Sequence, residues 1–165
     1  MALKKTVEAL LNQQLEKEYA AAAVYQAISI YFEQELLKGF AAWFKRQVSE
    51  ERAHGAKIIE YMLDRGGAPI LPAIPAPKMA YAAPLDALKA AVAHERANTA
   101  GIYACLAAAQ KADDPATVEV LQWFVKEQVE EEKWADEYTQ MLEKVAGSVG
   151  GLWAFDHRVE KLAQG

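Results

Sequence analysis

An acid and an imidazole interrupt the apolar face of a long predicted helix. In the stretch VSEERAHGAK, residues 48–57, Glu51 and His54 stand three residues apart, where apolar side chains should continue. Residues three apart share one helix face, so both side chains would point into the packing surface of that helix. A carboxylate and an imidazole placed together are typical ligands of transition metals.

The other three predicted long helices show the same interruption. An alternating step of three and four residues along each apolar face reaches Glu18 in the first helix and Glu95 in the third. In the fourth it reaches the pair Gln128 and Glu131. A separation of 33 residues divides Glu18 from Glu51 and also Glu95 from Gln128. The repeat predicts that six polar groups meet at one level of a helical bundle.

Four carboxylates in one core require positive charge. Burial of a single unpaired carboxylate costs several kcal/mol or forces the group to bind a proton. The four apolar faces carry no Lys or Arg at the positions counted above. Taken alone, a Glu/His pair is more often a solvated helix face or a core histidine than a ligand set, but four helices are interrupted at matching depth. Two divalent cations would balance four carboxylates, and oxygen ligands with one imidazole and no thiolate favour iron or manganese over structural zinc.

Glycines and prolines divide the chain into two helical hairpins. Long stretches lack both residues, and Asp113–Asp114–Pro115 provides a helix stop, an N-cap acid and a proline at the first helical position. A short turn is expected around Leu37–Gly39. The predicted helices lie within residues 1–38, 40–65, 85–112 and 116–146.

The segment between the hairpins, at about residues 66–84, is rich in proline and glycine and predicts extended backbone. A helix of about 27 residues is roughly 40 Å long, and about 17 extended residues reach roughly 55 Å. The segment can therefore cross the whole bundle and make the second and third helices parallel. A last amphipathic segment at about 150–163 is too short to be stable alone and must dock. We predict an all-α single domain over residues 1–165, with four long helices at about 4–146.

Composition excludes several classes of protein. The net charge is −5, from 18 basic and 23 acidic residues, and no basic tail indicates a nucleic-acid partner. The lone Cys105 cannot form an internal disulfide or a cysteine-rich metal site and suits a reducing compartment. The longest uncharged helical stretch, Tyr19 to Phe32, has 14 residues, short of the roughly 20 that span a bilayer. With no signal peptide apparent, we expect a cytoplasmic protein without membrane or nucleic-acid partners.

Several motifs together resemble the bacterial non-haem ferritins over essentially the whole chain. They are LEKEYAAAAVYQ in the first helix, SEERAH in the second, the acid of HERANT in the third, LQWFVKEQVEEEK in the fourth and the short fifth segment. The resemblance implies a ferritin-like four-helix bundle with one long crossover connection and a short C-terminal helix. It also implies a first iron held by Glu18, Glu51 and His54, and a second held by Glu51, Glu95 and Glu131, with Gln128 beside it.

The resemblance implies a third iron position at Glu50, Glu127 and Glu130. These acids lie next to the apolar faces rather than on them, so solvated helix acids are the alternative interpretation. Tyr25 lies two turns beyond Glu18 on the same face. It could donate a hydrogen bond to a ligand or an electron to oxygen reduction, or it could simply be a core tyrosine.

The sequence differs from three related families at positions that determine which cofactors and partners are expected. Bacterioferritins carry a second Glu-x-x-His motif in the fourth helix and a haem-binding methionine directly after the bridging glutamate. Here the first position holds Gln128-x-x-Glu131 and the second holds Arg52, so no haem is expected. Rubrerythrins add a cysteine-rich iron domain, which is absent. Mini-ferritins that protect DNA lack the fifth helix, so DNA is not an expected partner.

The resemblance implies a ferroxidase that stores iron. Two Fe(II) ions at neighbouring positions would each give one electron to dioxygen or hydrogen peroxide, and carboxylates stabilise the harder Fe(III) product. Storage as hydrous ferric oxide inside a homo-oligomeric shell of 24 subunits would follow. Two alternatives remain: a di-iron oxidase or peroxidase that protects against oxidative stress without bulk storage, and a metal-binding scaffold without turnover.

Overall fold

Five helices follow one another along the chain in the computed structural model, which describes residues 2–164. Within that range there is no β-strand, so the predicted all-α class is confirmed. None of the described helices is both long enough and apolar enough to cross a membrane. The helices are α1 (Lys5–Gln34), α2 (Lys38–Asp64), α3 (Pro84–Lys111), α4 (Pro115–Val145) and α5 (Val149–Gln164).

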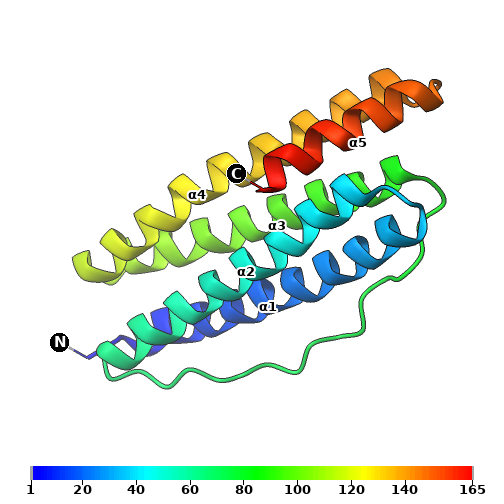
Figure 1. Cartoon of the computed structure of the whole chain (residues 1–165). Coiled ribbons are helices and arrows are strands. Elements are labelled where there is room, and N and C mark those ends of the chain that lie inside the picture. The colour runs from blue at the N-terminus through cyan, green and yellow to red at the C-terminus, as the bar shows by residue number, and fades with distance from the viewer. Residues whose placement is uncertain (1, 165) are drawn as a thin grey trace.

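Two antiparallel hairpins, α1–α2 and α3–α4, pack side by side, and a long linker between α2 and α3 runs the length of the bundle (Figure 1). Because of this linker, α2 and α3 run parallel, as predicted. The side chain of Asn12 on α1 holds the linker. Its Nδ2 donates to the carbonyl of Ala68 at 3.1 Å, and its Oδ1 accepts from the amide of Ile70 at 2.8 Å.

Asp114 and Pro115 begin α4 as the sequence predicts. The Asp114 carboxylate accepts a hydrogen bond from the amide of Thr117 at 3.2 Å, and Pro115 occupies the first helical position. Both Asp114 oxygens also accept from the guanidinium of Arg65, each at 3.1 Å. Since Arg65 caps the end of α2, this bidentate pair ties the two hairpins together at one end of the bundle.

The turn between α1 and α2 lies slightly earlier than predicted, because α2 begins at Lys38. Gly39 is therefore inside the first turn of α2 rather than in the loop. A Cβ at this position would lie 1.9 Å from the carbonyl oxygen of Asp156 on α5. The glycine thus serves the close approach of α5 rather than the turn.

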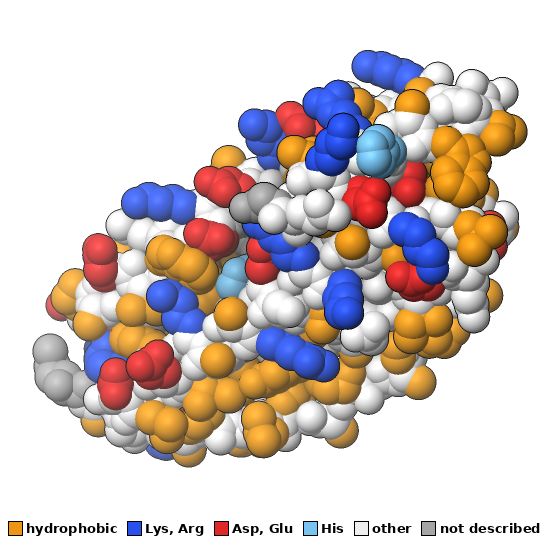
Figure 2. Space-filling model, viewed as in Figure 1, with side chains coloured by type: hydrophobic (Ala, Val, Ile, Leu, Met, Phe, Trp, Pro, Cys, Tyr) orange, Lys and Arg blue, Asp and Glu red, His pale blue; other side chains and the backbone are white. Residues whose placement is uncertain are grey.

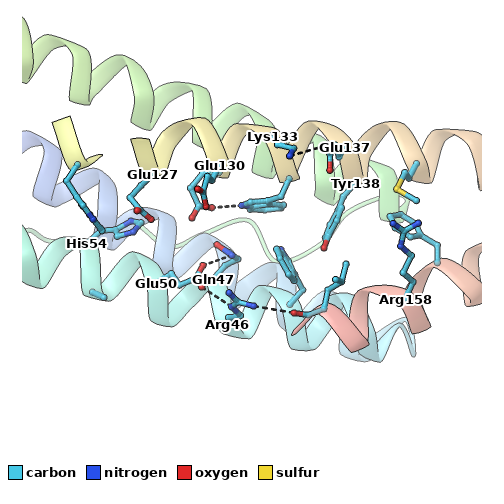
Figure 3. Close-up of a pocket in the computed structure, with 18 residues that line it drawn as sticks. Arg46, Gln47, Glu50, His54, Glu127, Glu130, Lys133, Glu137, Tyr138 and Arg158 are labelled. Carbon is cyan, nitrogen blue, oxygen red and sulfur yellow. Dashed lines mark hydrogen bonds and ion pairs between the residues drawn. The ribbon is translucent and has the colours of Figure 1, made fainter. Parts of the chain in front are cut away.

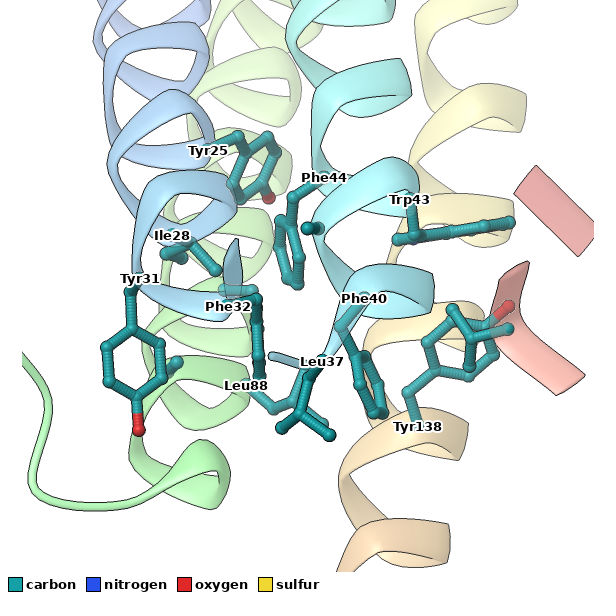
Figure 4. Packing of buried hydrophobic residues seen from close by; sticks show 14 of the residues in the cluster. Tyr25, Ile28, Tyr31, Phe32, Leu37, Phe40, Trp43, Phe44, Leu88 and Tyr138 are labelled. Carbon is teal, nitrogen blue, oxygen red and sulfur yellow. The ribbon is translucent and has the colours of Figure 1, made fainter. Parts of the chain in front are cut away.

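The hydrophobic core has two parts. One is rich in aromatic side chains, where Phe32 stacks on Phe40 and Phe44 (Figure 4). Phe155 of α5 meets Phe40 edge to face at 5.2 Å between ring centres. The other is mostly aliphatic and includes Leu15. Both parts contain side chains from all four long helices. The helices are therefore packed together on both sides of the segment of the bundle that separates the two parts.

Candidate metal centre

Six polar side chains interrupt the apolar core at one level of the bundle. Each is at most 6% exposed, although none is hydrophobic. They come from all four long helices. On each helix these residues lie at the same periodic positions as the apolar side chains, so they point into the core with them. The structure brings together the predicted ligands Glu18, Glu51, His54, Glu95 and Glu131, and Gln128 lies beside them, hydrogen-bonded to Glu95.

The carboxylates and the histidine form two groups that could each hold a metal ion. Glu18, Glu51 and His54 make one, and Glu51, Glu95 and Glu131 make the other. In each group, one potential ligand atom per residue lies within 4.8 Å of the others. Glu51 belongs to both groups, so its two oxygens can face two neighbouring metal positions.

Glu51 is fully buried, and neither of its carboxylate oxygens has a hydrogen-bond partner in the described chain. The Nδ1 atom of His54 also lacks one, at 3.7 Å from Glu18 Oε2 and 3.8 Å from Glu51 Oε2. A buried carboxylate without hydrogen-bond partners is costly. Coordination of a cation by both oxygens of Glu51 would remove that cost, so the residues present fit a metal pair.

Burial and mutual repulsion raise the proton affinity of the cluster. Burial raises the pKa of Glu51 well above its ordinary value; His54 opposes part of this rise, and the charges of Glu18 and Glu95 add to it. Burial and the charge of Glu95 raise the pKa of Glu131 to about 8. Burial alone would lower the pKa of His54, but the carboxylates of Glu18 and Glu51 raise it to about 11. Protons therefore balance part of the negative charge without metal, and a cation must displace them.

Glu95 and Glu131 have hydrogen-bond donors of their own. The hydroxyl of Tyr25, fully buried, donates to Glu95. The amide of Gln128 donates to Glu95 Oε2 at 3.2 Å. The indole of Trp134 donates to Glu131, a contact that the sequence analysis missed. The spacing in the sequence could have predicted this contact, because Trp134 stands three residues after Glu131 and so lies on the same face of α4.

A groove of about 880 Å³ between α2, α4 and α5 opens beside the cluster, and His54 lies on its wall (Figure 3). Glu131 also lines this groove. The acids predicted for a third iron position, Glu50, Glu127 and Glu130, line the same groove. They belong to neither of the two metal-capable groups found among residues 2–164. Glu50 instead accepts hydrogen bonds from Arg46 at 2.8 Å and Gln47 at 2.6 Å.

Comparison with known protein families gives a match over most of the chain. The ferritin family, described as a ferritin-like domain, matches residues 8–145. A bacterial non-heme ferritin of Staphylococcus epidermidis is 37% identical over 154 residues, which cover 93% of each chain. The bacterial non-heme ferritin of Staphylococcus aureus is 34% identical over the same length and share of each chain.

Comparison with solved structures gives the same fold. An open pore ferritin from the hyperthermophilic archaeon Archaeoglobus fulgidus superposes with a TM-score of 0.94 at 31% sequence identity. The alignment covers 96% of this chain and 98% of that one. A closed form of that ferritin, engineered by site-directed mutagenesis, superposes with a TM-score of 0.93. The predicted four-helix bundle with one long crossover and a short fifth helix is thereby confirmed.

Proposed function

The chain belongs to the ferritin family, and from that premise we propose that it is a ferroxidase that oxidises Fe(II) within each subunit and stores the Fe(III) product. The observation that carries this proposal is the position of Glu51 in two buried metal-capable groups, with both oxygens lacking hydrogen-bond partners. A carboxylate shared by two neighbouring positions suits a reaction that removes one electron from each of two metal ions.

The residues act on iron as substrate. Glu18 and His54 would bind one Fe(II), and Glu95 and Glu131 the other, while Glu51 bridges the pair. Carboxylate oxygens stabilise Fe(III) more than Fe(II), so the ligand set favours the oxidised product. Binding displaces the protons that the raised pKa values of His54 and Glu131 retain. Dioxygen or hydrogen peroxide accepts the electrons.

Three finer assignments are part of this proposal. Tyr25 donates a hydrogen bond to Glu95, so it can orient that ligand and lies close enough to supply an electron. Gln128 lies beside the second iron. Glu50, Glu127 and Glu130 line the open groove next to the pair, where a third iron would be in contact with solvent.

Storage requires a hollow assembly, and we propose a homo-oligomeric shell of 24 subunits, located in the cytoplasm. Two features of the chain support assembly. Hydrophobic side chains gather along the lower edge of the face in Figure 2, where the linker runs in Figure 1. Linker residues Ile70 and Leu71 are 65% and 74% exposed. Apolar surface on a loop that is already anchored to α1 suits contact with another subunit.

The site assignment is tested by aerobic addition of Fe(II) to metal-free protein, with oxo-ferric absorbance as the measurement. Glu51→Ala removes the shared ligand and His54→Ala removes the imidazole. Each variant should slow the initial oxidation at least about tenfold. Glu60→Ala serves as the matched control, because Glu60 is an exposed acid on the same helix. Its rate should equal that of the unaltered protein. Unchanged rates in both site variants would refute the assignment.

A further inference from the structure

Two neutral amides hold the carboxylate of Glu18. Gln14 Nε2 donates to Glu18 Oε1 at 2.7 Å, and Asn98 Nδ2 donates to Glu18 Oε2 at 3.1 Å. Gln14 Nε2 also donates to Asn98 Oδ1 at 3.0 Å, which closes the network between α1 and α3. All three residues are at most 3% exposed. Each Glu18 oxygen therefore has one fixed donor, whereas neither oxygen of Glu51 has any.

Hydrogen bonding determines which way the Gln14 amide faces. Its nitrogen meets two acceptors, Glu18 Oε1 and Asn98 Oδ1. The reverse orientation would place the Gln14 carbonyl oxygen against both acceptors and lose both bonds. In the observed orientation, Gln14 Oε1 is buried without a partner. The orientation that directs the Gln14 donor at Glu18 therefore leaves one buried oxygen without a hydrogen bond, which is unfavourable in free energy.

Gly101 makes room for this arrangement. It lies in the interior of α3, where glycine is unfavourable relative to alanine. A Cβ at Gly101 would lie 2.0 Å from Gln14 Oε1 and 2.7 Å from Lys17 Nζ. Lys17 is exposed and can move aside, but Gln14 is enclosed. A side chain at position 101 would therefore displace the Gln14 amide and break its bond to Glu18.

We propose that Gln14, Asn98 and Gly101 are positioning residues that fix the Glu18 carboxylate for the first iron before the metal arrives. The inference rests on the proposed role of Glu18 as an iron ligand. Neutral donors suit this task, because a Lys or Arg partner would cancel the negative charge that attracts the cation. Two hydrogen bonds from two helices hold the side chain in one rotamer, so binding does not have to order it.

The test measures binding of Co(II), a probe that leaves oxidation out of the experiment. Metal-free protein is titrated with Co(II), and the visible absorption bands of the bound ion are recorded. His54→Ala should remove the absorption bands and the binding step of the first metal position, and Glu131→Ala those of the second. The two variants thereby assign a spectrum and an affinity to each position. In Asn98→Leu, the affinity of the position that needs His54 should fall about 10- to 100-fold, while the position that needs Glu131 stays unchanged. Gln14→Met, of similar length without a donor, should act alike and serves if Asn98→Leu does not fold.

A double-mutant cycle tests the role of Gly101. Gly101→Ala alone should weaken Co(II) binding at the first position about as much as Gln14→Ala alone. In the Gln14→Ala background, Gly101→Ala should have no further effect, because the group it displaces is gone. In a Lys17→Ala background, Gly101→Ala should keep its full effect. Additive losses for Gly101→Ala and Gln14→Ala would overturn the assigned role of the glycine.

The outcomes separate this inference from the proposed function. If the unaltered protein fails to bind two Co(II) per subunit, or binds them without need of Glu51, the proposed function fails. If it binds two and both Gln14→Met and Asn98→Leu bind both ions with unchanged affinity and spectrum, the positioning role is wrong while the proposed function stands. Equal losses at both positions would indicate general damage to the bundle and would also overturn the positioning role.

Discussion

At the scale of single residues, Glu131 is one of the buried groups that make the stability of the metal-free protein depend on pH near neutrality. Burial, together with the charge of Glu95, raises its pKa from 4.5 to about 8, although the indole of Trp134 opposes part of that rise. Between these values the folded chain keeps a proton that the unfolded chain releases. The proton favours the folded state, so stability is lost as pH rises through this window. His54, with its pKa raised from 6.5 to about 11, acts in the same direction above pH 6.5.

We therefore expect the free energy of unfolding of the metal-free protein to fall by about 3 kcal/mol between pH 6.5 and pH 8, with Glu131 and His54 contributing similar shares. Urea unfolding at constant protein concentration measures it. Glu131→Gln should show a shallower decline, because its amide does not titrate. The pKa of His94 is lowered by burial from 6.5, so its contribution falls mainly below this window. Stability that rises with pH between 6.5 and 8 would contradict the assignment.

At the scale of helices, α5 supplies the N-terminal cap of α2. The residue before α2, Leu37, makes no side-chain capping bond. The buried carboxylate of Asp156 on α5 accepts from the backbone amides of Gly39 at 3.0 Å and Phe40 at 2.9 Å. Its charge also interacts favourably with the N-terminal end of the α2 dipole. Together with buried Phe155, these bonds dock a helix that is too short to be stable alone.

Asp156→Ala should lower the free energy of unfolding by about 1 to 3 kcal/mol, because two buried amides lose their acceptor. Asp156→Asn should cost less, since its single carbonyl oxygen can still accept one of the two bonds. Hydrogen exchange is the second measurement, and amides of α5 and the first turn of α2 should lose protection in the alanine variant. If alanine and asparagine variants unfold like the unaltered protein, the docking does not depend on this cap.

At the scale of the whole molecule, storage and simple oxidation predict different sizes and different iron capacities. Twenty-four chains of 18.2 kDa have a mass of 24 × 18.2, or about 437 kDa. Size-exclusion chromatography with light scattering should give this mass, and aerobic loading should take up many more than two irons per chain. A small species that oxidises about two irons per chain and then stops would favour the alternative, a di-iron oxidase or peroxidase without bulk storage.

The sequence by itself determined the four long helices and the six polar groups at one level of the bundle. Both follow from local periodicity: Glu51 and His54, three apart on one helix, share a face wherever that helix packs. Asp114 and Pro115 begin α4 by the same kind of local rule. The Gly39 position was misjudged because a glycine indicates a turn or a close approach equally well. Which of the two applies depends on α5.

Only the tertiary structure decided which side chains support the ligands. Gln14 and Asn98 are 84 residues apart, and Asp156 lies more than 110 residues from the amides that it caps. No periodicity joins such positions, because the distance between them depends on how closely two helices approach and in what register. The sequence therefore predicted which acids turn inward, and helix packing decided which of them are held by donors and which, like Glu51, are left without hydrogen-bond partners.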